Sequence, residues 1–368
     1  MKTTIWICGI FAVFSISDGL AQTAGAPQQS SNLLNPNISA ILNILSGFGN
    51  SADLPEGAFQ LDEVELGIQS VVDPYFRADA FIGYHGEEVE VEEAYLTWLT
   101  MPGGLQAKIG KFRAGFGKFN PIHPPETGLA DRPLSSLNFF GEEGLGSAGA
   151  SVSWLVPIDI FLKLTAEVTT IWEGAAAFGT IDTTTIDTTT AELVFSEKRE
   201  DLGYLGRAET FFDLSEASNI ALGGTVAAAI NSPDENLWTH LFGGDLTLRW
   251  KNPRRAVYRS VTWKNEFLYN RRQMPPGQAD IGTIGFFSIL DWQFSKRWHA
   301  GGRYDYSEFP DMEGPNEKGG LVYLTFTPSE FSLVSLQGRH ILRPDGTNDT
   351  AGFVKLTFNV GPHGAHLF

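Results

Sequence analysis

Residues 105–133, LQAKIGKFRAGFGKFNPIHPPETGLADRP, join a strand of alternating character to a long, proline-rich loop. Successive side chains of a strand point to opposite faces. One face holds Ile109, Lys111 and Arg113 and carries the positive charge of Lys111 and Arg113. The other is apolar, from Gly110, Phe112, Ala114 and Phe116. A soluble sheet would bury the apolar face in a core, whereas a membrane barrel would turn it to lipid and keep the charges in its lumen.

The N-terminus has the pattern of an export signal. Lys2 supplies the positive charge, an apolar stretch follows, and small residues end at Ala21. An anchor helix is the alternative, but the apolar run of about 12 residues is too short to span a bilayer. We therefore expect a cleaved signal peptide at residues 1–21 and a flexible periplasmic leader at 22–36.

Composition narrows the fold class and the partners. Beyond residue 21, no stretch of the sequence approaches the ~20 apolar residues that a spanning helix needs. A membrane-embedded chain without such helices must form a closed barrel, because only closure satisfies every backbone group in hydrocarbon. The formal net charge of −17 argues against nucleic-acid binding, which depends on Lys and Arg at the phosphates.

From residue 37 to residue 368 the chain alternates in segments of about ten residues, the length of a tilted membrane strand. Short connections alternate with longer ones, as periplasmic turns alternate with external loops in outer-membrane barrels. The sequence predicts an all-β fold, a transmembrane antiparallel β-barrel of about 16 strands with both termini in the periplasm. The first strand has poor periodicity, and the even count depends on it. The predicted strands are 37–48, 60–71, 75–85, 89–100, 105–116, 144–156, 158–173, 201–212, 219–230, 238–251, 258–271, 281–294, 297–308, 319–327, 331–341 and 350–360.

The alternation assigns charges of both signs to the lumen, and mixed charge in a wide barrel implies water. In the second strand, Glu63 and Glu65 are assigned inward. The predicted pore-lining residues are Arg77, Asp79, Glu93, Lys111, Arg113, Arg303, Asp305, Arg339 and Lys355. Phe112, Ala114 and Phe116 are assigned to lipid.

The loop 117–143 is the candidate constriction of the lumen. Its four prolines stiffen it, and a stiff loop that folds inward would narrow a pore and make it selective. The alternative is an external loop that caps the mouth. The loop's candidate residues are His123, Glu126, Asp131 and Arg132. We expect Lys111 and Arg113 to form the cationic half of the constriction, and Glu126 and Asp131 the opposing acids.

Metal and catalytic signals are weak. Imidazoles suit zinc, so the candidate ligands are His123, His363 and His366, but no cysteine or HExxH spacing accompanies them. The glycines of residues 144–149 match a dinucleotide-binding pattern but open a strand, where that motif would open a helix. No nucleophile elbow or P-loop is present. We expect no cofactor and no enzymatic activity.

Four stretches resemble a family of Gram-negative outer-membrane porin-like barrels, often described as zinc-regulated TonB-dependent outer-membrane receptors. They are VDPYFRADAFIGY, VEEAYLTWLTMPGGLQAKIGKFRAGFGKFNPIHPPETGLADRPL, FFGEEGLGSAGASVSWLVP and NVGPHGAHLF. GKFRAGFGKFN is also similar to a strand motif of phosphate-selective porins O and P. The terminal Phe368 resembles the aromatic residue that the barrel-assembly machinery recognises.

The resemblance implies a porin that passes small polar or charged solutes by diffusion, in contact with outer-membrane lipid and lipopolysaccharide, and assembled as a homotrimer. The alternative that it implies is a receptor or binding barrel linked to zinc or metal uptake. A TonB-dependent receptor has a plug ahead of its barrel, and residues 22–36 are too few to fill a lumen. We therefore expect passive diffusion.

Overall fold

The computed structural model describes residues 36–361, apart from 53, 56, 87, 173, 182–192, 197, 233–235 and 255–257. The predicted signal peptide, the leader up to residue 35, and the residues His363, His366 and Phe368 lie outside the described part of the chain.

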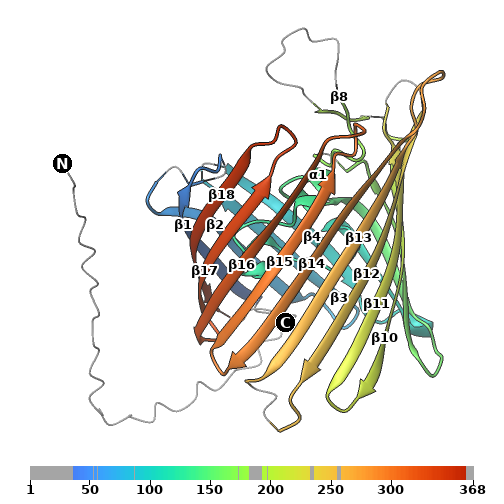
Figure 1. Ribbon diagram of the computed structural model, residues 1–368. Helices are drawn as coiled ribbons and strands as arrows, with labels where there is room; N and C mark the ends of the chain where they lie inside the picture. Colours follow the sequence, from blue (N-terminus) through green and yellow to red (C-terminus); the bar gives the residue numbers. More distant parts are fainter. Residues whose placement is uncertain are drawn as a thin grey trace, which may run out of the picture. The chain divides into compact units, whose positions relative to one another are not determined.

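Within the described residues, sixteen strands form one closed antiparallel barrel, in which neighbours in sequence are neighbours in the sheet (Figure 1). The prediction of a 16-stranded barrel is confirmed. Two short strands, β8 (Thr180–Ile181) and β9 (Leu193–Val194), pair separately. The barrel strands are β1 (Asn37–Gly49), β2 (Gln60–Val71), β3 (Phe76–His85), β4 (Glu88–Trp98), β5 (Leu105–Arg113), β6 (Gly146–Leu155), β7 (Phe161–Thr170), β10 (Leu202–Ser215), β11 (Ser218–Ile230), β12 (Trp238–Lys251), β13 (Ser260–Arg272), β14 (Ile281–Ser295), β15 (Trp298–Glu308), β16 (Asn316–Ser329), β17 (Ser332–Leu342) and β18 (Asn348–Val360).

The weakly periodic first strand closes the barrel, since β1 pairs with β2 on one side and with β18 on the other. Its poor alternation has a structural cause. Ile41 and Leu45 are buried on the inner face, and Leu45 packs there against Phe353. A strand that is apolar on both faces shows no polar alternation in its sequence.

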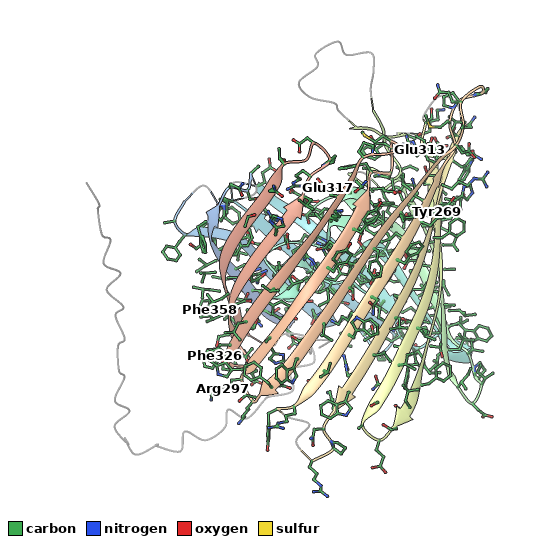
Figure 2. The ribbon with its side chains drawn as sticks, in the orientation of Figure 1. Tyr269, Arg297, Glu313, Glu317, Phe326 and Phe358 are labelled. Carbon is green, nitrogen blue, oxygen red and sulfur yellow. The ribbon has the colours of Figure 1, made fainter. Side chains whose placement is uncertain are left out.

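The outer surface of the barrel is apolar and ends in aromatic rings. Large exposed side chains cover the strands, among them Val152, Leu164, Val226, Phe267, Leu290, Val322 and Leu336. Cross-strand ring pairs lie near the rim of the short turns: Phe76–Trp98, Phe161–Phe211 and Trp298–Phe326. Figure 2 shows Phe326 and Phe358 close to this rim, near Arg297. An apolar band with an aromatic girdle is the surface that a barrel presents to lipid.

Ile109 and Lys111 of β5 face the opposite way from the prediction, whereas Arg113 at the end of the strand is buried. Ile109 is 63% exposed and pairs with Leu96, which is also exposed. Lys111 pairs with Ala94 on the same side of the sheet, so it belongs to the outer row. There it forms an ion pair with Glu90, with a Nζ–Oε1 distance of 2.7 Å. The prediction that Lys111 lines the pore is wrong.

Phe112, Ala114 and Phe116 do not face lipid, which corrects a second prediction. All three are almost completely buried. β5 ends at Arg113, and the chain beyond it turns into the barrel. The physical reason is that the barrel encloses a hydrophobic core of its own, so an apolar residue on an inward row has partners there.

The segment that supplies this core is residues 114–145, the internal loop. It contains a short 3-10 helix, Pro124–Thr127, and α1 (Leu134–Phe140), which packs against β14, β15 and β16. No helix in the described part of the chain is long and apolar enough to cross a membrane. The internal loop and the segment 171–178 bury one apolar cluster against β10 to β13: Ala114, Phe116, Phe139, Phe140, Leu145, Ile171, Trp172, Ala175, Ala177, Phe178, Leu205, Ala227, Ala229, Leu241 and Leu268.

Candidate functional site

Carboxylates of the barrel wall bind the backbone of the internal loop. Glu266 of β13 accepts hydrogen bonds from the N–H groups of Lys118 (2.6 Å) and Phe119 (2.7 Å). Glu167 of β7 accepts one from Gly115 (3.1 Å). A loop inside a barrel has no strand partner for its N–H groups, so it needs such acceptors. These bonds show that the loop folds inward, which the sequence left open.

On strands β15 and β17, two arginines hold one acid of the loop. Asp131 lies 2.8 Å from Nη2 of Arg303 in β15 and 2.7 Å from Nη1 of Arg339 in β17. Arg303 also binds Asp305 at 2.6 Å. Burial alone would raise the pKa of Asp131, but the two guanidiniums hold that pKa below its ordinary value. The sequence analysis predicted Asp131, Arg303, Asp305 and Arg339 as separate candidates. In the structure these four residues form one cluster.

Side chains of β17 and β18 form hydrogen bonds with the backbone of the residues just before Asp131. Lys355 donates a hydrogen bond to the carbonyl of Leu129 at 2.7 Å. The amide of Gln337 accepts from Ala130 N–H and donates to the Gly128 carbonyl, both at 2.9 Å. Lys355 is buried, and its ammonium group holds the loop through this bond.

Two arginines at the base of the internal loop differ in how they are compensated. Arg113 is buried and binds Glu92 at 2.8 Å and Glu143 at 3.4 Å. Arg132 stacks over the ring of Phe119 at 5.5 Å. Among the described residues, no acceptor reaches any of its three guanidinium nitrogens. Burial, and then the charge of nearby Arg113, lower the pKa of Arg132 to about 10.

His123 of the internal loop is surrounded by wall carboxylates. Its Nδ1 lies 2.8 Å from Glu92 and 3.0 Å from Glu65, and its Nε2 lies 3.1 Å from Glu93. Burial opposes the charged imidazole, but hydrogen bonds to these acids raise the pKa of His123 well above its ordinary value. The contacts are those of an imidazolium that ties the loop to β2 and β4.

A β-bulge explains why two consecutive glutamates face inward. Glu93 pairs with Phe81 and Val91 with Ile82, so the residue between them, Glu92, has no partner on β3. A bulge of this kind breaks the alternation of the strand. Both Glu92 and Glu93 are therefore buried inside the barrel.

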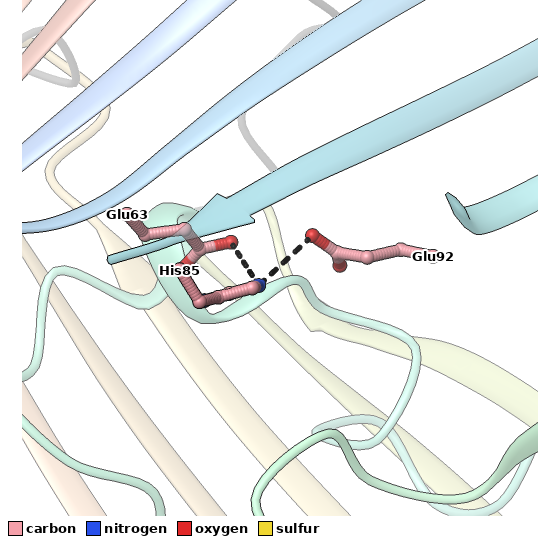
Figure 3. A group of neighbouring side chains, drawn as sticks. All are labelled: Glu63, His85 and Glu92. Atoms are coloured by element: carbon pink, nitrogen blue, oxygen red, sulfur yellow. Dashed lines mark ion pairs between the residues drawn. The ribbon is translucent and has the colours of Figure 1, made fainter. Parts of the chain in front are cut away.

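Next to His123 lies a second group, made of Glu63, His85 and Glu92, that could hold a metal ion (Figure 3). It comes from three consecutive strands, and one ligand atom of each residue lies within 4.8 Å of the other two. The sequence placed Glu63 inward but did not single out His85. The register of the β2–β3 and β3–β4 hairpins places His85 near Glu63 and Glu92. The sequence could have predicted this group only if the bulge at Glu92 had been known.

The remaining predicted residues lie apart from these groups. Arg77 and Asp79 pair at 2.8 Å near the short-turn end of β3. Glu126 is exposed on the internal loop. The predicted site is therefore two clusters on different parts of the wall, joined by one loop.

No established family model matches the sequence. An uncharacterized protein of Aquifex aeolicus (strain VF5) is 30% identical over 340 residues, which cover 84% of this chain and 70% of that protein. The chain belongs to the same family as this Aquifex protein. Because that relative is itself uncharacterized, kinship alone assigns no activity.

Solved structures with the same fold are outer-membrane channels. OprB of Pseudomonas putida superposes with a TM-score of 0.58 at 9% identity, over 89% of this chain and 94% of that one. An anion-selective porin from Comamonas acidovorans gives 0.55 at 10% identity, over 89% and 99%. The trimer form of OmpT from Vibrio cholerae gives 0.51 at 8% identity, over 89% and 99%. At these identities the likeness shows the fold alone. The resemblance to TonB-dependent receptors and phosphate-selective porins stays a prediction.

Proposed function

We propose that this protein is an outer-membrane porin, a water-filled channel that the internal loop narrows and through which small polar or charged solutes diffuse. The observation that carries the proposal is the attachment of one loop to many strands of a closed barrel whose outer face is apolar. A loop held inside the lumen sets the width and charge of the path, which is how a pore acquires selectivity.

The attachments divide the internal loop into three fixed regions. Glu167 and Glu266 hold residues 115–119, the carboxylates around His123 hold its middle, and Arg303 and Arg339 hold Asp131. Each fixed region shields wall charges that a bare barrel would expose to water. The loop therefore controls which charges a solute meets.

The proposal includes the membrane, the export route and the oligomeric state of the channel. Its apolar band supports contact with outer-membrane lipid and lipopolysaccharide. The N-terminal pattern supports export by a signal peptide cleaved after residue 21, and Phe368 supports recognition by the barrel-assembly machinery. The trimer form of OmpT supports a homotrimer.

Reconstitution of the purified protein into planar bilayers tests the proposal. We expect stepwise increases of conductance, and a reversal potential in a salt gradient that reports the charge preference of the path. A heat-denatured sample of the same preparation is the control. If the folded protein gives no conductance steps beyond those of this control, the proposal is wrong.

A further inference from the structure

We propose that Glu63, His85 and Glu92 bind a divalent transition-metal ion on the inner wall of the barrel. The observation that points to a ligand is a set of three buried atoms without hydrogen-bond partners among the described residues: Glu63 Oε1, His85 Nε2 and Glu92 Oε1. The side chains of Glu63 and Glu92 are only 4% and 2% exposed. Buried polar atoms are normally paired, so three orphans that face one another require an explanation.

The distances between these atoms suit a shared ion better than hydrogen bonds. Nε2 of His85 lies 4.0 Å from Glu63 Oε1 and 3.7 Å from Glu92 Oε1 (Figure 3), which is too long for a hydrogen bond. Ligand atoms at about 2.1 Å from a zinc ion lie about 3.4 Å apart in a tetrahedral site. An ion between the three atoms would need each side chain to move by roughly a few tenths of an ångström.

In the neighbouring His123 group, by contrast, the imidazole nitrogens lie within hydrogen-bonding distance of carboxylate oxygens. There the nitrogen–oxygen distances are 2.8, 3.0 and 3.1 Å, so the imidazole itself occupies the centre of its carboxylates. Glu92 belongs to both groups and turns Oε2 toward His123 and Oε1 toward His85. The Glu92 carboxylate thus uses Oε2 for the salt bridge with His123, and its Oε1 is available to bind an ion.

A glycine keeps the space between the ligand atoms open. A Cβ atom at position 83 would collide with Oε1 of Glu92 and would lie 2.8 Å from Nε2 of His85. Gly83 is on β3, two residues before His85. Any other residue there would push the ligand atoms apart.

Charge and ligand type define the class of ion. In the metal-bound state His85 must be neutral, because a protonated imidazole cannot ligate. The carboxylates Glu63, Glu65, Glu92 and Glu93 then have Arg113 and His123 as their direct cationic partners in the described part of the barrel. A divalent cation would balance the two remaining negative charges. One imidazole with two carboxylates suits zinc, manganese or iron, whereas calcium prefers six to eight oxygens and no nitrogen.

The exposed part of His85 gives an ion access to this site. His85 ends β3, and its side chain is 32% exposed, in contrast to the two carboxylates. Three protein ligands leave at least one coordination position for water or for a group on a passing solute. The proposed site does not depend on conduction, so it stands or falls separately from the porin proposal.

Isothermal titration of ZnCl₂ into the full-length, chelator-treated protein in detergent tests the site. The experiment uses a His363→Ala, His366→Ala background, which removes two of the other candidate histidines and keeps His123, whose two ring nitrogens are already bound by carboxylates. We expect one zinc ion per chain, and a loss of affinity of at least about tenfold in His85→Gln and in Glu63→Gln. His299→Gln is the matched control, because His299 is an inward histidine bound to a single acid, Asp291.

Gly83→Ala is a second test that removes no ligand. The added Cβ should displace the ligand atoms and weaken zinc binding, while heat-modifiable gel mobility confirms that the barrel is folded. Absence of a zinc isotherm in the background protein would overturn the proposal. So would unchanged affinity in His85→Gln, or tighter binding of calcium than of zinc.

Discussion

Oδ1 of Asp131 lies 2.8 Å from Nη2 of Arg303, so an acid of the internal loop forms a buried ion pair with a cation of the barrel wall. The two residues are 172 positions apart in sequence. The second oxygen of Asp131 binds Arg339. Asp131 thus bridges two almost completely buried wall guanidiniums, of which Arg303 also binds Asp305 and Arg339 also binds Asp349.

Asp131→Asn should release this part of the loop. Removing one partner of a buried ion pair typically costs about 3–5 kcal/mol. Arg303 keeps Asp305 and Arg339 keeps Asp349, so we expect a smaller loss here. We expect a lower denaturant midpoint and a larger or noisier single-channel conductance. Asp345→Asn is the control, since Asp345 is on the exposed turn between β17 and β18 and accepts its hydrogen bonds from Thr347. Equal conductance in the two variants would contradict the assigned role of Asp131.

The same pair predicts a dependence on acid. Because the pKa of Asp131 is lowered in the folded protein, its stabilising effect is present above the unfolded-state pKa of about 3.9 and is lost as the pH falls through the lower folded value. We expect the loop to stay in place from pH 8 down to about pH 5 and to loosen below about pH 4. Conductance recorded across this range should change less in Asp131→Asn than in the wild type. An identical acid response in both would show that other groups control the loop.

Glu266 offers a test of the backbone attachments. Glu266→Gln keeps an oxygen that can accept from the N–H groups of Lys118 and Phe119, whereas Glu266→Ala leaves both buried donors unpaired. An unpaired buried group costs about 1–3 kcal/mol. We expect the alanine variant to unfold at clearly lower denaturant and to conduct more, and the glutamine variant to stay near wild type. The account fails here if the two variants behave alike.

Two adjacent glycines of β12 occupy opposite faces of the barrel wall: Gly243 faces the inside and Gly244 the outside. A Cβ on Gly243 would lie 2.6 Å from the ring of buried Phe116, whereas one on Gly244 would meet nothing within 4 Å. Gly243→Ala should therefore cost about 1–3 kcal/mol through overpacking, and Gly244→Ala should stay within about 0.5 kcal/mol of wild type. Unfolding midpoints of both variants check this, and equal midpoints would place Phe116 elsewhere.

The strands were predictable because a barrel strand needs opposite characters on its two faces. The prediction of 60–71 coincides with β2 and that of 238–251 with β12. The facing of β5 was not predictable by the same rule. Lys111 lies on the outer row, where Glu90 neutralises it, and Phe112 lies on the inner row, where the internal loop brings apolar partners. Alternation identifies two faces but cannot say which one meets lipid when the lumen holds a core.

The site was predictable only as separate residues. Arg303, Arg339 and Asp131 carry charge at positions that the pattern identifies, but their pairing depends on the path of a loop that has no strand register. Glu92 was missed for another reason. A bulge turns it inward beside Glu93, and a bulge leaves no reliable mark on a single sequence.

Single-channel recording of the wild type beside a variant in which a short Gly/Ser linker replaces residues 120–138 of the internal loop tests the central claim most directly. The account predicts discrete conductance steps for the wild type and larger steps, with weaker charge selectivity, for the variant. Equal step size and selectivity in a variant shown to be folded, or no steps from either protein, would contradict it.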